Sequence, residues 1–122
     1  MKYGILSAIA LLFACIVYTQ DMTPLIEEAA KLEKNLKETE ALETYQSVLK
    51  IQPDNIIAMC KAAELTGRIG SRFKDDSKKT EYFAAAKSYA EAALKQKQHI
   101  ADAYYVMSYT AMKLATVTKG KE

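Results

Sequence analysis

Two stretches of this chain resemble each other at a distance of 45 residues, and this internal repeat limits the possible folds more than any other feature. Residues 45–63 and residues 90–108 both read as the end of one helix, a short polar break and the beginning of the next helix. A small residue lies at the same place in both second helices, Ala63 in one and Ser108 in the other. Repeated helical hairpins bury their apolar faces by stacking on their neighbours. The repeat therefore predicts an all-α fold of antiparallel helical hairpins stacked as a solenoid.

Composition and charge narrow the class of protein further. Half of the residues are hydrophobic, 26% are charged, and there are only 4 Gly and 2 Pro, which fits a folded helical protein rather than a disordered one. The formal net charge of +2 gives no general attraction to polyanions. We therefore expect no nucleic-acid partner.

Residues 1–20 differ from the rest of the chain and read as an export leader. Lys2 supplies a positive start, residues 4–17 are apolar without a charge, and polarity returns from Tyr18, which is the order of a signal peptide. A lipoprotein leader is the alternative, because Cys15 ends a short sequence similar to a lipobox. The apolar run is shorter than the roughly 20 residues that span a bilayer. We expect an exported protein, periplasmic or extracellular, that meets a membrane only through this leader or a lipid anchor.

The spacing of apolar residues after the leader predicts about five helices within residues 21–117. The predicted helices begin near Pro24, near Ala41, at Ile56, at Thr80 and at Ala101.

Breaks between these helices are predicted from turn-forming residues. Leu36 is expected to be the last inward-facing residue of the first helix, before a break at residues 37–39. Gly67 and Gly70 are expected to mark the end of the third helix, and residues 70–79 read as an exposed connecting loop. The fourth helix should reach about Gln98 and the fifth about Val117, which leaves residues 118–122 as a tail.

The repeat unit resembles the tetratricopeptide repeat, a helical hairpin of 34 residues. With Pro53 at the near-terminal proline of that pattern, residues 22–55 form one unit of standard length. The eighth position of the pattern is small because two helices cross there, and the fourth is large. The small positions are Ala29, Ala63 and Ser108, the large ones are Leu25, Met59 and Tyr104, and the small twentieth position falls on Ala41 and Ala86. The second unit, residues 56–100, is 11 residues longer, and we assign the extra residues to its connecting loop.

A narrower resemblance rests on the long loop, on Tyr-Ala-Glu-Ala-Ala-Leu at residues 89–94 and on Ala-Asp-Ala-Tyr-Tyr at residues 101–105. Together they resemble the repeat segment of the regulator of microtubule dynamics protein family and its bacterial relatives, over about residues 40–117. This resemblance implies a tetratricopeptide-like domain without known catalysis that usually continues further. The third unit here stops after its first helix. We therefore expect either a truncated chain or a last helix that binds a partner or forms a homo-oligomer with a second copy.

The resemblance to tetratricopeptide repeats also indicates a binding face, because the first helix of each hairpin lines the concave side of such stacks. The positions of the pattern that face this side in the second and third units mix aromatic, apolar and charged residues, a composition suited to a protein or peptide ligand. The residues expected to bind a peptide are Cys60, Glu64, Arg68, Tyr105, Tyr109, Met112 and Lys113. The alternative is that the aromatic residues only shield the end of the stack.

The chain lacks the residues that catalysis or cofactor binding would require. No Gly-rich phosphate loop is present, and His99 is the only histidine, so neither a catalytic triad nor a metal site is expected. Cys60 is left alone if Cys15 belongs to a leader. The basic residues between Arg68 and Lys79 are interrupted by Asp75 and Asp76, which favours a solvated loop over an anion site. We expect no catalysis, no metal and no cofactor.

The sequence therefore favours an exported, non-enzymatic tetratricopeptide repeat scaffold that binds a protein or peptide segment through its concave face. Two alternatives stay open: a truncated structural fragment of a longer repeat protein, and a lipid-anchored adaptor of the cell envelope.

Overall fold

The computed structural model describes residues 20–96 and 101–119, and these residues form five helices without a strand. The helices are α2 (Thr23–Lys34), α3 (Glu38–Ile51), α4 (Ile56–Gly70), α5 (Asp76–Leu94) and α6 (Ala101–Thr118). The predicted leader, apart from Gln20, lies outside the described residues. Within the described part, none of the helices has the length and apolar character needed to cross a bilayer.

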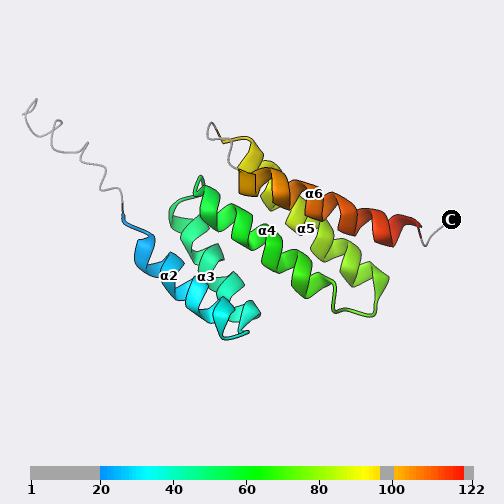
Figure 1. Ribbon diagram of the computed structural model, residues 1–122, viewed down its shortest axis with the longest axis horizontal. Helices are drawn as coiled ribbons and strands as arrows, with labels where there is room; N and C mark the ends of the chain where they lie inside the picture. The colour runs from blue at the N-terminus through cyan, green and yellow to red at the C-terminus, as the bar shows by residue number, and fades with distance from the viewer. Residues whose placement is uncertain (1–19, 97–100, 120–122) are drawn as a thin grey trace, which may run out of the picture.

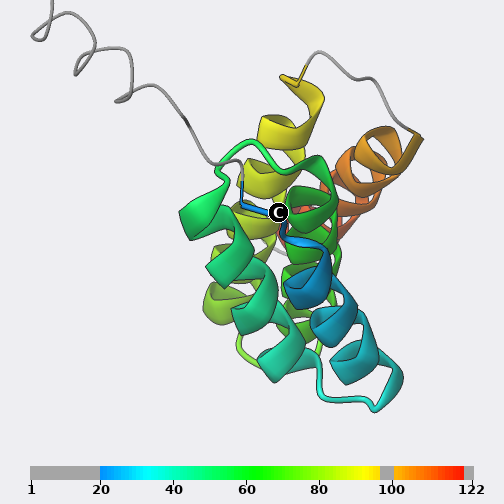
Figure 2. The same cartoon turned by 90° about the vertical axis from the view of Figure 1, so that its left-hand side faces the viewer.

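The helices are arranged as two antiparallel hairpins followed by a single helix, which confirms the predicted all-α stack. Each helix packs on the next one along the chain, and α4 also contacts α6 (Figure 1). In the turned view, α3 and α5 lie on one side of the stack and α2 and α6 on the other, with α4 between them (Figure 2). The second helices of the two hairpins, α3 and α5, therefore form one side of the stack.

Small residues hold the two hairpins together at their crossings. Ala29 and Ala41 in the first hairpin and Ala63 and Ala86 in the second are fully buried, as the repeat pattern predicts. Alanine at a crossing lets two helix axes approach to about 8–10 Å. One hydrophobic cluster lies between α2, α3 and α4 and another between α4, α5 and α6. Helix α4 contributes to both clusters, so its sequence is apolar on most sides.

The predicted inward face of the last helix is wrong by one residue. Ser108 is exposed and Tyr104 is 54% exposed. The residues that α6 buries instead are Ala103, Val106, Thr110 and Val117. In the first two hairpins the eighth position packs against the second helix of the same hairpin, and no described helix follows α6. The helix therefore buries the neighbouring strip, which faces α4 and α5.

Several helix boundaries also differ from those predicted: α3 begins at Glu38, inside the expected break at residues 37–39, and α5 ends at Leu94 rather than near Gln98. Helix α5 begins at Asp76, four residues before Thr80, because the carboxylate of Asp75 accepts the Ser77 backbone N–H at 3.0 Å and caps the helix. The expected loop at residues 70–79 is thereby reduced to residues 71–75. The first helix ends at Lys34, and Leu36 lies in the turn with φ 60° and 87% of its surface exposed. The predicted inward position of Leu36 is therefore wrong, because the chain has already left the helix.

Gly67 does not end α4, contrary to prediction, and Gly70 is its last residue. Both are places of close approach. A Cβ atom on Gly70 would lie 2.6 Å from Cβ of Tyr82 on α5, and one on Gly67 would lie 2.6 Å from Cε1 of Tyr109 on α6. Ordinary contacts are longer, so each glycine allows a neighbouring helix to pack directly against the α4 backbone.

We expect Gly70→Ala to destabilise the protein by about 1–3 kcal/mol, because Cβ of Tyr82 is fixed to the α5 backbone and only a helix shift removes the clash. Both changes replace Gly by a better helix former, which favours the helix by about 0.5–1 kcal/mol. The new methyl group of Gly67→Ala meets only the movable ring of Tyr109. Chemical denaturation of the two variants checks this difference. Equal stability of both variants would contradict the close packing of α5 on α4.

Candidate peptide-binding face

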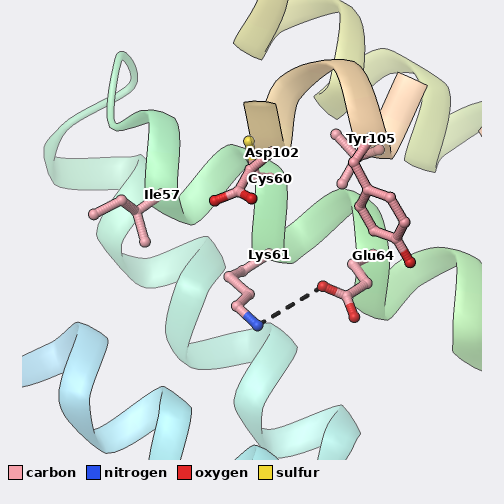
Figure 3. A pocket seen from close by; sticks show the side chains of 7 residues that line it. Ile57, Cys60, Lys61, Glu64, Asp102 and Tyr105 are labelled. Carbon is pink, nitrogen blue, oxygen red and sulfur yellow. Dashed lines mark ion pairs between the residues drawn. The ribbon is translucent and has the colours of Figure 1, made fainter. Parts of the chain in front are cut away.

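The candidate site lies where α4 and α6 run beside each other. A cavity of about 180 Å³ opens between these helices, and Figure 3 shows its labelled side chains. Its lining comes from α4 and from the first half of α6: Ile57, Cys60, Lys61, Glu64, Asp102, Tyr105 and Val106. Three of the seven predicted residues, Cys60, Glu64 and Tyr105, therefore share one cavity.

Two further predicted residues, Tyr109 and Lys113, form a row with Tyr105 along α6. The rings of Tyr105 and Tyr109 stack with their centroids 6.1 Å apart, and Nζ of Lys113 lies 5.5 Å from the centroid of Tyr109. Residues four apart on a helix are neighbours, which explains this arrangement. Tyr109 is partly buried, and this burial raises the pKa of its hydroxyl. Tyr105 is 56% exposed. Tyr105 is therefore the part of this row that a ligand can reach most easily.

Met112 does not line the cavity. It is 57% exposed and lies seven residues after Tyr105, hence on the same strip of α6. It can extend an apolar contact that begins at Tyr105, but only outside the cavity.

Cys60 forms part of the cavity wall and has no chemical activity to offer there. Its thiol is buried, and burial together with the nearby carboxylate of Asp102 raises its pKa to about 11. A thiol with this pKa stays protonated at neutral pH and is a poor nucleophile. Cys60 thus acts as a small apolar surface.

Arg68 and Glu64 belong to an ion network that holds the first three described helices together. The guanidinium nitrogens of Arg68 lie 3.3 Å from a carboxylate oxygen of Glu33 on α2, 3.0 Å from one of Glu38 on α3 and 3.0 Å from one of Glu64 on α4 itself. Burial acts to lower the pKa of the Arg68 guanidinium, but the three carboxylates outweigh it and raise the pKa. The guanidinium of Arg68 is therefore already paired with carboxylates of the chain itself. Its main role is to hold the helices together rather than to bind a ligand.

The other members of this network are not among the predicted site residues. Lys61 pairs with Glu33 at 3.4 Å and with Glu64 at 3.7 Å, and Arg72 also pairs with Glu38. The hydroxyl of Tyr45 donates to Glu33 at 3.0 Å, and burial with this carboxylate raises the pKa of Tyr45. Only two local spacings signal the network in the sequence: three residues between Lys61 and Glu64 and four between Glu64 and Arg68. The pairs with α2 and α3 connect residues about 30 positions apart.

Comparison with known proteins decides the family. A family model described as regulator of microtubule dynamics protein 1-3 matches residues 25–122. The chain belongs to this family. Neither the curated proteins nor the solved structures include a significant match. The match extends beyond the residues 40–117 of the predicted resemblance and covers all five described helices except the first two residues of α2.

In this member of the regulator of microtubule dynamics family, α4 and α6 present a face that combines apolar, aromatic and charged side chains. No group of three or more His, Cys, Asp or Glu within the described ranges is placed to hold a metal ion. The cavity combines apolar wall, one reachable aromatic ring and carboxylates at its edge. Such a surface can hold an extended or helical segment by shape and hydrogen bonding.

We expect Arg68→Met to destabilise the protein by about 2–3 kcal/mol, because it leaves the nearly buried carboxylates of Glu33 and Glu38 with fewer partners. The matched change Arg72→Met removes a side chain that is 64% exposed and has one partner in the described part of the chain, and should cost under about 1 kcal/mol. Urea denaturation measures both. Equal losses would show that Arg68 does not organise the network.

Proposed function

We propose that this chain is a non-enzymatic scaffold that binds a protein or peptide segment across α4 and α6. The observation that carries the proposal is the cavity of about 180 Å³ with the half-exposed ring of Tyr105 at its edge. Exposed aromatic rings beside a depression are the residues on which binding energy concentrates in interfaces. Ile57, also half-exposed, supplies apolar area at the other end of the cavity.

The charges around this face favour a ligand segment that carries both apolar and polar groups. Asp102, Glu64 and Lys61 line the cavity, and Lys113 lies over Tyr109. Because Lys61 and Glu64 already pair with each other, Asp102 is the carboxylate most open to a donor on the ligand. We propose an apolar side chain in the cavity and a hydrogen-bond donor at Asp102.

We also propose that the protein acts outside the cytoplasm. The support is the sequence of residues 1–20, with an uncharged apolar run between Lys2 and Tyr18, which has the order of a signal peptide. A ligand would then belong to the same compartment.

The binding proposal is tested with a peptide selected from a displayed library on the full chain. Tyr105→Ala should weaken binding of that peptide at least tenfold, the usual effect of removing an aromatic anchor. Leu36→Ala removes a large exposed side chain at the far α2–α3 turn and is the matched control. Fluorescence polarisation measures both. A peptide that binds both variants as well as the parent chain does not use this face, and the assignment would be wrong.

A second candidate function, self-association through α6, is supported by the outer face of that helix. Tyr104 and Met112 are more than half exposed there, and Ser108 and Ala111 are exposed between them. In an antiparallel pair of α6 helices centred on Ser108, Tyr104 of one copy meets Met112 of the other, and the small central residues allow close contact. This face is therefore complementary to itself.

If α6 forms such a pair, the full chain should elute as a dimer, and Ser108→Glu should convert it to a monomer by placing two like charges at the centre. Ser88→Glu, the same change at an exposed position of α5, should leave the dimer intact. Size-exclusion chromatography with light scattering measures the mass. A monomeric parent chain would rule out this candidate.

A further inference from the structure

A second hollow lies on the other side of the stack, between α3 and α5, with α4 beneath it. Its volume is about 330 Å³, within the range of small-ligand pockets. Gln46 on α3 donates to the hydroxyl of Tyr89 on α5 at 3.2 Å, and both residues line the hollow. This hydrogen bond links the two walls. We call the hollow the α3/α5 cleft.

A buried polar group contributes to this cleft from α4. Thr66 lines the cleft and is only 4% exposed, yet its hydroxyl has no hydrogen-bond partner among the described residues. Several other helical threonines donate to the carbonyl about one turn earlier, as Thr44 does to Glu40 at 2.9 Å and Thr80 does to Asp76 at 2.7 Å. A buried hydroxyl without a partner costs free energy. The Thr66 hydroxyl therefore has an unused hydrogen-bonding capacity, and because its oxygen is itself buried, a ligand atom reaches it only when the side chains around it shift.

The charged residues of the cleft are all acidic. Glu43 from α3 and Glu81 from α5 line it and are exposed, and no Lys, Arg or His lines it. Neither carboxylate forms an ion pair within the described residues, unlike Glu40 and Glu91 on the same two helices, which pair with Lys37 and Lys87. Two unpaired carboxylates on facing walls attract a cation.

The remaining lining fits the rest of a cationic ligand. Leu42 and Ala85 give the cleft apolar wall, and Tyr82 and Tyr89 add aromatic rings. Aromatic rings attract cations over their faces, and apolar wall accommodates the methylene stem of a long basic side chain. A guanidinium has five N–H groups, enough to bond a carboxylate and still donate to a hydroxyl.

We propose that the α3/α5 cleft is a binding site for an alkyl ammonium or guanidinium group on an aliphatic stem. Such a group is found in a Lys or Arg side chain of a partner protein and in a free polyamine. The cation lies between Glu43 and Glu81 against the tyrosine rings, and one of its N–H groups donates to the Thr66 hydroxyl. This site is separate from the α4/α6 face and does not depend on the function proposed there.

The test is a titration of the full chain, followed by amide chemical shifts, with three probes: N-acetyl-arginine amide, its neutral analogue N-acetyl-citrulline amide, and spermidine. The arginine probe or spermidine should shift the signals of Thr66, Tyr82 and Tyr89 in a saturable way, with Kd in the millimolar range usual for so small a ligand. The citrulline probe should not. Tighter binding of spermidine would indicate a polyamine as the natural ligand, and tighter binding of the arginine probe would indicate a side chain.

Paired variants separate the cleft from general charge effects. Glu43→Gln with Glu81→Gln should weaken the cationic probe at least fivefold, whereas Glu40→Gln with Glu91→Gln removes equal charge from the same helices outside the cleft and should change Kd less than twofold. Thr66→Val should weaken the probe at least threefold and raise the melting temperature of the free protein, because it removes an unsatisfied hydroxyl. Equal weakening by both glutamate pairs, equal binding of the arginine and citrulline probes, or no saturable shift with either cation would overturn the proposal.

Discussion

The stack depends on how closely α4 lets its neighbours approach. Ala63 lies fully buried where α4 crosses its own hairpin partner, and Gly67 and Gly70 bring Tyr109 and Tyr82 against the α4 backbone. Larger residues at these positions would hold the helices apart, and the hollows beside α4 would change shape with them. Both proposed binding surfaces, the α4/α6 face and the α3/α5 cleft, therefore take their geometry from small residues in one central helix.

The sequence was sufficient for the parts of the fold that local spacing controls. Periodic apolar residues located the five helices, and the small positions at Ala29, Ala41, Ala63 and Ala86 are buried as expected. The family resemblance is confirmed by the match over residues 25–122. The sequence alone did not show which neighbouring helix each apolar helix face packs against. The register of α6 was wrong because the repeat pattern assumes a following helix, and the turn at Leu36 was missed because nothing in the residue type indicates a positive φ.

The candidate site shows the same limit. Spacing on α4 and α6 was enough to gather Cys60, Glu64 and Tyr105 around one cavity. It was not enough to show that Arg68 is engaged by Glu33 and Glu38, since those residues are separated from it by 35 and 30 positions. Nor could it reveal the unused hydroxyl of Thr66, because whether a helical threonine bonds its own backbone depends on the side-chain rotamer. Long-range pairing and rotamers are properties of the folded chain.

The ion network has a consequence for how the molecule comes apart. Within the described residues, each ion pair that joins one helix to another involves α4 or the residue Arg72 just after it, together with α2 or α3. None of those pairs reaches α5 or α6, which are held by apolar packing, by the hydrogen bond from Gln46 to Tyr89 and by close contacts such as that of Tyr109 on Gly67. The amino-terminal three helices thus form a cross-linked block, and α6 is the element least tied to it. Local opening should begin at that end and leave the block intact, so the α4/α6 face can widen for a ligand while the α3 wall of the cleft stays fixed.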